Sequence, residues 1–149
     1  MATISYVVGD ATSPIGEGNK IIIHCCNNIG AWGAGFVLEL SKKWMQPEIA
    51  YNIMKKRELG NVQYIRVEND IMVANMIGQN GVYAKNGKPP IDYEAIRKCL
   101  INVNDMALQT NSTIHSPRFG AGLAGGDWNV IETIIKEYIY FDVTVYDLH

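Results

Sequence analysis

The chain has 149 residues, of which 48% are hydrophobic and 19% are charged, and its formal net charge at pH 7 is −2. This composition is typical of a globular protein and excludes a disordered chain, and the length predicts a single domain, residues 1–149. Lysines and arginines are scattered without a dominant basic block. The sequence therefore gives no electrostatic support for non-specific binding to a nucleic-acid backbone.

No apolar run approaches the roughly 20 residues that a membrane-spanning helix needs. The N-terminal stretch "MATISYVVGD" lacks the basic start and apolar segment of a signal peptide. Three cysteines, with Cys25 and Cys26 adjacent, make neither a disulfide framework nor a metal-binding pair. We therefore expect a reduced, cytoplasmic protein with no membrane partner and no bound metal, and nothing in the sequence favours an obligate oligomer over a monomer.

The first third of the chain alternates between apolar and glycine-rich segments. Residues 3–8 are β-branched and alternating, which predicts a strand, and 11–19 contain the proline and glycines of a loop. Residues 20–24 are almost wholly apolar and predict a strand buried on both faces of a sheet. Helical spacing of apolar residues follows from 34 to 43, and a second helix is expected from Pro47 to about Arg57.

In the middle of the chain, residues 62–67 and 71–77 predict two strands joined by a short turn. Three glycines and two prolines make 78–90 a loop. Residues 91–109 predict a long helix because their apolar side chains fall on one stripe.

The last third repeats the alternation with a short strand in "STIHSP", a glycine-rich loop in "RFGAGLAGG", a helix in "DWNVIETIIKEYI" and a final strand in "DVTVYDL". Strands interleaved with helices predict an α/β fold with a mostly parallel sheet covered by helices on both sides.

The same construction occurs twice, at 24–36 and at 116–128: an apolar strand ends, a glycine-rich loop follows and a helix begins. Helix N-termini present unpaired N–H groups, and glycines let backbone amides approach an anion closely. In open α/β sheets such loops meet at the carboxyl ends of the strands. The pair favours a diphosphate ligand, although strand-to-helix turns often carry glycine for structural reasons alone. Neither loop is a Walker A motif or a dinucleotide fingerprint.

Four motifs in the same order, "VVGDAT", "IIIHCCNNIGAWGAGF", "SPRFGAGLAGGDW" and "VTVYDL", together resemble the macrodomain family. They resemble most its branch of small stand-alone members that process ADP-ribose 1″-phosphate or remove ADP-ribose from proteins. The resemblance implies a three-layer α/β/α sandwich that binds ADP-ribose, or a derivative of it, at the carboxyl ends of the strands and uses no cofactor.

Carried over position by position, the resemblance assigns the ligand contacts. Asp10 falls on the adenine-recognising aspartate, although an aspartate after a strand is also an ordinary turn former. Asn27 falls on the asparagine that holds the distal ribose, and Tyr146 and Leu148 are candidates for the wall beside adenine or for burial in the last strand. The full predicted binding set is Asp10, Ala11, Asn27, Gly33, Ala34, Gly35, Phe36, Phe119, Gly120, Ala121, Gly122, Leu123, Tyr146 and Leu148.

His24 and Asp127 are the predicted catalytic residues. A neutral imidazole at the end of the second strand either orients water or donates a proton to the leaving oxygen, or is a structural core histidine. Asp127 is either a general base or ribose ligand, or the N-cap of the last helix, or both.

Two departures from the family bear on the reaction. Members that cleave ADP-ribose from glutamate use a lysine and an aspartate where this chain has Gln79 and Ala124. Lys85 or Lys88 replaces that lysine only if the 78–90 loop folds inward. The first choice of reaction is therefore hydrolysis of the 1″-phosphomonoester. The alternatives are hydrolysis of ADP-ribosylated protein or nucleic acid or of O-acetyl-ADP-ribose, and binding of ADP-ribose without turnover.

Overall fold

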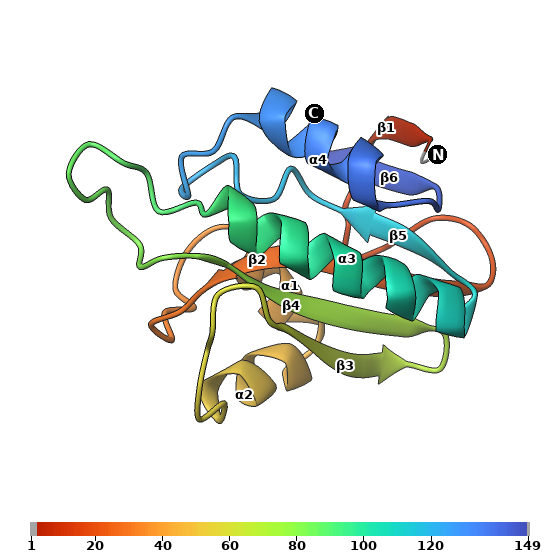
Figure 1. Ribbon diagram of the computed structural model, residues 1–149. Helices are drawn as coiled ribbons and strands as arrows, with labels where there is room; N and C mark the ends of the chain where they lie inside the picture. Colours follow the sequence, from red (N-terminus) through yellow and green to blue (C-terminus); the bar gives the residue numbers. More distant parts are fainter. Residues whose placement is uncertain (1–2, 149) are drawn as a thin grey trace.

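A computed structural model describes residues 3–148, which contain a six-stranded sheet of order β1-β6-β5-β2-β4-β3 (Figure 1). Every neighbouring pair is parallel except β3 and β4, which form an antiparallel edge. The mostly parallel sheet predicted from the sequence is confirmed. The strands are β1 Ile4–Val8, β2 Asn19–Asn27, β3 Val62–Glu68, β4 Ile71–Gln79, β5 Ser112–Ser116 and β6 Val143–Asp147.

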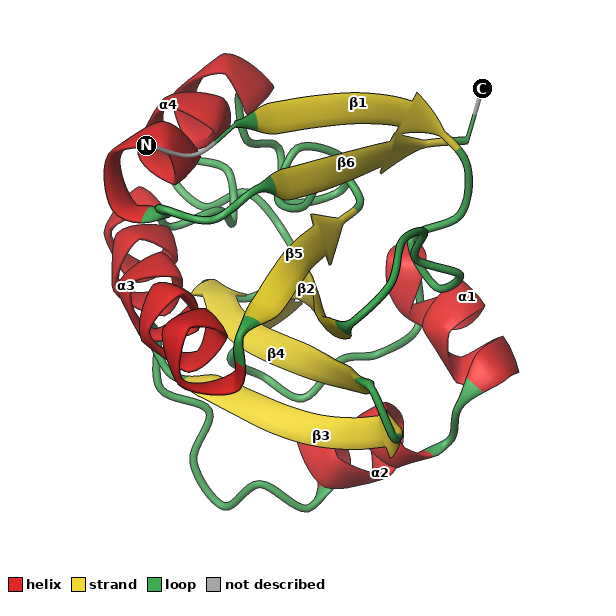
Figure 2. Ribbon diagram, turned by 90° about the vertical axis from the view of Figure 1, so that its right-hand side faces the viewer, coloured by secondary structure: helices red, strands yellow, loops and turns green. Residues whose placement is uncertain are grey.

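The helices cover both faces of the sheet and complete the predicted three-layer sandwich. Figure 2 shows α3 (Tyr93–Thr110) and α4 (Trp128–Tyr138) on one side, and α1 (Phe36–Lys43) and α2 (Gln46–Asn52) on the other. Successive residues of β2 pack against the helix layers on opposite faces of the sheet. Ile21 and Ile23 pack in the core under α3 and α4, whereas Ile22 packs with Leu40 of α1.

The boundaries of α3 follow from its sequence. Asp92 caps the helix by accepting from the backbone N–H of Ala95 at 2.9 Å, and Asn111 ends it in the left-handed conformation with φ 50°. The buried stripe predicted for this helix includes Ile96, Leu100 and Val103. None of the helices in 3–148 is long and apolar enough to cross a membrane.

Two predicted boundaries are wrong. The second strand does not stop at His24 but continues to Asn27, because Cys25 and Cys26 pair with Met76 and Ile77 of β4. The helix after Pro47 ends at Asn52, not near residue 57.

The early end of α2 has a local cause. The guanidinium of Arg57 donates to the carbonyl oxygens of Tyr51 (3.0 and 3.2 Å) and Asn52 (3.1 Å), which are among those that the end of a helix leaves without intrahelical partners. Arg57 therefore caps the C-terminal end of α2 with its side chain and is not itself part of the helix.

Candidate functional site

Three hollows follow the carboxyl edge of the parallel strands. The first hollow, of about 720 Å³, lies around Asp10, Glu39 and Leu148. The middle hollow, of about 170 Å³, lies around His24 and Gly122. The third hollow, of about 480 Å³, is lined by residues that include Asn27, Trp32 and Tyr83.

The hollows adjoin one another. The first and middle hollows share Gly35, Phe36 and Arg118, and the middle and third share Ala34 and Leu123. The three hollows therefore form one continuous groove, and we call this groove the cleft. Its narrow middle lies between the two glycine loops that the sequence singled out.

The first glycine loop leads into α1 without a side-chain cap. Gly35, the N-cap residue, has φ +81°, a conformation that other residues adopt only with strain. Since glycine has no side chain, it makes no capping hydrogen bond. The first N–H groups of a helix have no intrahelical partners. The N–H of Leu38 donates to the carbonyl oxygen of Gly35 at 3.1 Å. Because α1 has no capping side chain, the N–H groups of Phe36 and Val37 remain available to an anion in the cleft.

The second glycine loop is held by close backbone packing. A Cβ at Gly120 would lie 2.6 Å from Ile91 Cδ1, and one at Gly126 would lie 2.5 Å from the carbonyl oxygen of Gly120. The Gly126 N–H also donates to that oxygen at 2.8 Å. Gly122, at the cleft, has no atom within 4 Å of its Cβ position. The base of this loop is fixed, and its tip is open toward the cleft.

His24 is a buried residue of the middle hollow. It pairs across the sheet with Asn75 of β4, and its Nε2 lies 2.5 Å from Asn75 Oδ1. The rings of Trp32 and Phe36 pack on it with centroids 5.5 and 5.7 Å away. The imidazole is thus fixed on three sides.

The hydrogen bonds of Asn75 fix the tautomer of His24. Asn75 Nδ2 donates to Pro47 O and Gln63 Oε1, each at 3.1 Å, so Oδ1 faces His24 as an acceptor and His24 Nε2 carries the proton. Burial lowers the pKa of His24 to about 4. At neutral pH the imidazole is uncharged and its N–H is used by Asn75. Nδ1, which lies 3.9 Å from Cys26 Sγ, is the ring atom that can accept a hydrogen bond.

Asn27 organises the loop that walls the third hollow. Its Oδ1 accepts from the N–H groups of Ile29 (3.1 Å) and Ala31 (3.0 Å) and from the hydroxyl of Tyr51 (2.8 Å). Its Nδ2 donates to Ala31 O at 2.8 Å. Most of the hydrogen-bonding capacity of this amide is used within the loop, so its structural role is established by these contacts and its ligand role remains a prediction.

Asp10 forms a turn at the mouth of the first hollow. Its Oδ1 accepts from the N–H and the hydroxyl of Thr12, both at 2.8 Å. The turn-forming interpretation is therefore correct for one carboxylate oxygen. The residue is exposed and lines the hollow, so the two predicted roles are compatible.

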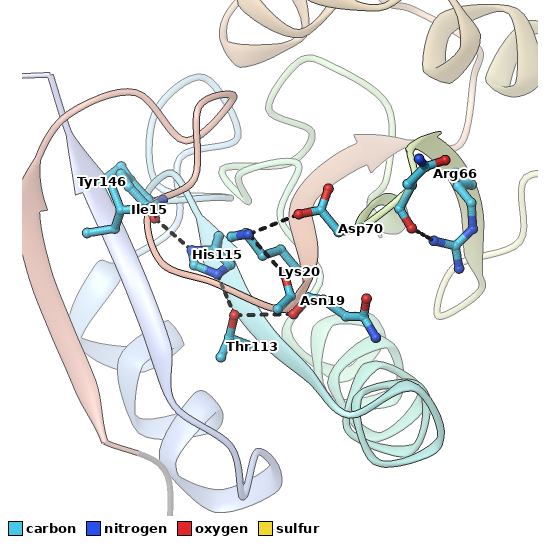
Figure 3. A network of polar contacts seen from close by, with 10 residues as sticks. Ile15, Asn19, Lys20, Arg66, Asp70, Thr113, His115 and Tyr146 are labelled. Atoms are coloured by element: carbon cyan, nitrogen blue, oxygen red, sulfur yellow. Dashed lines mark hydrogen bonds and ion pairs between the residues drawn. The ribbon is translucent and has the colours of Figure 1, made fainter.

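Tyr146, the wall of the first hollow, is held by a chain of hydrogen bonds that Figure 3 displays. Its hydroxyl accepts from the N–H of Ile15 (3.0 Å) and donates to His115 Nδ1 (2.7 Å). His115 Nε2 donates in turn to Thr113 Oγ1 (2.7 Å), whose hydroxyl points to the carbonyl oxygen of Asn19. These hydrogen bonds connect the loop after β1 to the sheet.

The imidazole of His115 is neutral within this series of hydrogen bonds. Burial and the nearby ammonium group of Lys20 lower its pKa to about 4. Lys20 is itself buried and donates to the carbonyl oxygen of Gly18 (3.0 Å) and to Asp70 (3.4 Å).

The comparisons with solved structures decide the family. The chain is 51% identical to a protein of unknown function from Bacteroides thetaiotaomicron, over 99% of each chain, with a TM-score of 0.96. It is 44% identical to a macrodomain protein from Streptomyces coelicolor, over 97% of this chain and 99% of that one, with a TM-score of 0.84. The chain belongs to the macrodomain family. The resemblance stated from the sequence is confirmed.

More distant relatives agree with the fold. No family model matches the chain. A Candida albicans protein named ADP-ribose 1″-phosphate phosphatase is 27% identical, over 95% of this chain and 99% of that protein. A Thermosipho africanus DarTG structure in complex with ADP-ribose shares the fold, with a TM-score of 0.77 at 13% identity, over 98% of this chain and 42% of that one. The chain spans only 14% of a chromodomain-helicase-DNA-binding protein 1-like from Danio rerio, to which it is 29% identical over 91% of its own length.

The macrodomain cleft gathers most of the residues predicted from the sequence. Those that line it are Asp10, Ala11, His24, Asn27, Gly33, Ala34, Gly35, Phe36, Gly120, Gly122, Leu123, Tyr146 and Leu148. Gln79 and Ala124 also line the middle hollow. The lysine and aspartate of the glutamate-cleaving members therefore have no equivalents at these two positions of the cleft.

Three predicted site residues do not line the cleft. Phe119 is buried against the ring of Trp128, with centroids 5.7 Å apart, and Ala121 is half-buried. Asp127 is exposed at the start of α4, where its Oδ1 accepts from Asn129 N at 2.9 Å. The capping interpretation of Asp127 is correct, and its proposed part in catalysis has no geometric support.

We expect Asp127→Ala to lower the free energy of unfolding by about 1 kcal/mol, the usual effect of losing a helix N-cap, while leaving ligand affinity unchanged. Urea unfolding and calorimetry measure the two quantities. Asn129→Ala, which removes a neighbouring polar side chain but keeps the capping bond to the backbone, is the control. A tenfold loss of affinity in Asp127→Ala alone would return this residue to the binding site.

Arg118 is a cleft residue that the sequence analysis missed. It lines the first and middle hollows and contacts both carboxylate oxygens of Asp147, at 2.7 and 3.0 Å. This contact lowers the pKa of the Asp147 carboxyl. Its guanidinium also lies over the rings of Tyr6 and Trp128. The sequence carried a signal, since arginine is favoured wherever phosphate is bound and Arg118 stands two residues before Gly120 of the second glycine loop.

Proposed function

We propose that this macrodomain binds ADP-ribose along the cleft, with adenine in the first hollow, the diphosphate in the middle hollow and the distal ribose in the third. The uncapped start of α1 is the observation that carries the proposal. Its free N–H groups and positive helix end face the narrowest part of the cleft, opposite the open tip of the second glycine loop. Arg118 adds a positive charge between the first two hollows.

We propose hydrolysis of ADP-ribose 1″-phosphate as the reaction. The water oxygen bonds to phosphorus, the bond from phosphorus to the ribose oxygen breaks, and that oxygen leaves with the proton from water. The similarity to the Candida albicans phosphatase supports this choice. Backbone N–H groups at the third hollow would stabilise the charge on the transferring group.

In this proposal His24, whose ring packs against Trp32 of the third hollow, orients the attacking water from the boundary between the middle and third hollows. Its Nδ1 can accept a hydrogen bond from water in place of the Cys26 thiol, whose Sγ lies 3.9 Å away, whereas a pKa of about 4 leaves no second ring proton to donate at neutral pH. Of the two enzymatic roles considered from the sequence, water orientation therefore fits and proton donation does not.

A second candidate is an ADP-ribose-binding module without turnover. The titratable residues that line the middle hollow are His24, Cys25 and Arg118. Burial raises the pKa of the Cys25 thiol to about 12, and Arg118 is paired with Asp147. A hollow with so little acid–base capacity favours binding over chemistry.

Calorimetry with ADP-ribose and phosphate release from ADP-ribose 1″-phosphate separate the two candidates. In His24→Gln, which keeps an N–H donor for Asn75, we expect phosphate release to fall at least tenfold and the ADP-ribose dissociation constant to change less than threefold. Circular dichroism checks that the variant is folded. Tight ADP-ribose binding without phosphate release in the wild type leaves only the binding module, and no heat with ADP-ribose contradicts both.

A further inference from the structure

A tight hairpin, "KNGK" at residues 85–88, lies between β4 and α3. The N–H of Lys85 donates to the carbonyl oxygen of Lys88, and the N–H of Lys88 donates to that of Lys85, both at 2.9 Å. Asn86 and Gly87 have φ +53° and +76°. Positive φ at both central residues is typical of a type I′ turn, whose backbone matches the twist of paired strands. The backbone itself therefore fixes the positions from which the two lysines project.

This hairpin places two like charges side by side. Residues that exchange both backbone hydrogen bonds are directly opposite, with their side chains on the same face and their Cβ atoms about 5 Å apart. Like charges in that arrangement repel each other. Within residues 3–148 neither lysine has an ion-pair partner. The nearby carboxylate of Asp92 is used as the cap of α3.

Both lysines line a fourth hollow, the lysine hollow, of about 570 Å³. Its other walls include Asn80, Tyr83 and Tyr93. Tyr83 also lines the third hollow of the cleft, so the lysine hollow adjoins the end at which the distal ribose is proposed to lie. The sequence analysis considered these lysines as replacements for a catalytic lysine. They line neither the middle nor the third hollow, so that alternative has no geometric support.

We propose that Lys85 and Lys88 bind a phosphate group attached beyond the distal ribose of an ADP-ribose derivative. This inference rests on the proposed function, which identifies the ligand as an ADP-ribose derivative. The two lysines of the hairpin indicate that the additional group is negatively charged. A phosphate dianion between two ammonium groups removes their mutual repulsion and makes charge-assisted hydrogen bonds with both. The hairpin then distinguishes the phosphorylated derivative from ADP-ribose itself, which ends at the third hollow.

Calorimetry with ADP-ribose and with ADP-ribose 1″-phosphate tests this assignment, in the His24→Gln background, where we expect turnover to consume the ligand at least ten times more slowly. We expect the phosphorylated ligand to bind at least tenfold more tightly. In Lys85→Ala/Lys88→Ala the preference falls below threefold while ADP-ribose affinity is unchanged. Lys55→Ala/Lys56→Ala, which removes two exposed charges that line none of the four hollows, retains the full preference. A preference that persists without Lys85 and Lys88 overturns the proposal.

A second measurement separates failure of the hairpin from failure of the proposed function. Inorganic phosphate is titrated into ¹⁵N-labelled protein, and the amide resonances of residues 80–93 are followed. Saturable shifts in the wild type that disappear in Lys85→Ala/Lys88→Ala support the phosphate site even if ADP-ribose does not bind. Shifts that are absent, or equal in the two proteins, overturn it.

Discussion

Gly35→Glu should weaken ADP-ribose binding at least a hundredfold, which corresponds to about 2.7 kcal/mol. Gly35 lines both the first and the middle hollow, at the start of α1 where the diphosphate is proposed to lie. Only Leu123 Cδ1, at 3.7 Å, is within 4 Å of its Cβ position, so a longer side chain would extend into the cleft. A carboxylate there would occupy the anion site and repel the ligand.

Isothermal calorimetry measures the loss. The control is Gly16→Glu, which places the same charge at another glycine of positive φ (+97°), with nothing within 4 Å of its Cβ position and outside the cleft. Both variants carry the strain of a side chain at positive φ, so any difference in affinity between them reports on the site. Unchanged affinity in Gly35→Glu would mean that the start of α1 does not hold the diphosphate.

Acidification should destabilise the fold through its two buried imidazoles. Burial lowers the pKa of His24 and of His115 from the usual 6.5 to about 4. Between pH 6.5 and 4 the unfolded chain therefore binds protons that the folded chain does not. The stability conferred by the neutral imidazoles is complete above pH 6.5 and is lost as the pH falls, by about 3 kcal/mol for each histidine at pH 4.

Urea unfolding at pH 7, 5.5 and 4.5 tests this dependence. In His24→Gln and His115→Gln the free energy of unfolding should decrease less steeply with falling pH than in the wild type, because the unfolded state of each variant has one imidazole fewer to protonate. The comparison within one pH series cancels the contribution of carboxylates common to all three proteins. Parallel curves for wild type and both variants would show that neither histidine is held neutral by burial.

Most of the fold follows from local signals in the sequence. Glycine and proline separate the elements, alternation marks the strands, and Asp127 and Asn111 stand where α4 starts and α3 ends. The extension of β2 to Asn27 could not be predicted in this way. Cys25, Cys26 and Asn27 carry no strong strand signal, and they are extended because β4 provides their hydrogen-bond partners.

The same distinction, between local sequence signals and contacts set by strand pairing, applies to the site. The glycine loops and Asp10 are contiguous motifs, so the sequence places them at the ends of strands, where the structure has them. Asn75, which fixes the tautomer of His24, lies 51 residues away from it and meets it only through the register of β2 and β4. Contacts of this kind depend on how strands align, which no local pattern specifies.

The position of Arg57 gives the small helix α2 an influence beyond its size. Its guanidinium closes the helix, lies 4.8 Å from the ring centre of Tyr51, and comes within 3.1 Å of the Cβ position of Gly30 in the loop of the third hollow. Tyr51 in turn hydrogen-bonds Asn27. Fraying at the end of α2 would release both the loop and its anchor, so we expect this helix and the loop of the third hollow to open together in local unfolding. The stability of this part of the cleft then depends on a helix of seven residues, none of which lines the cleft.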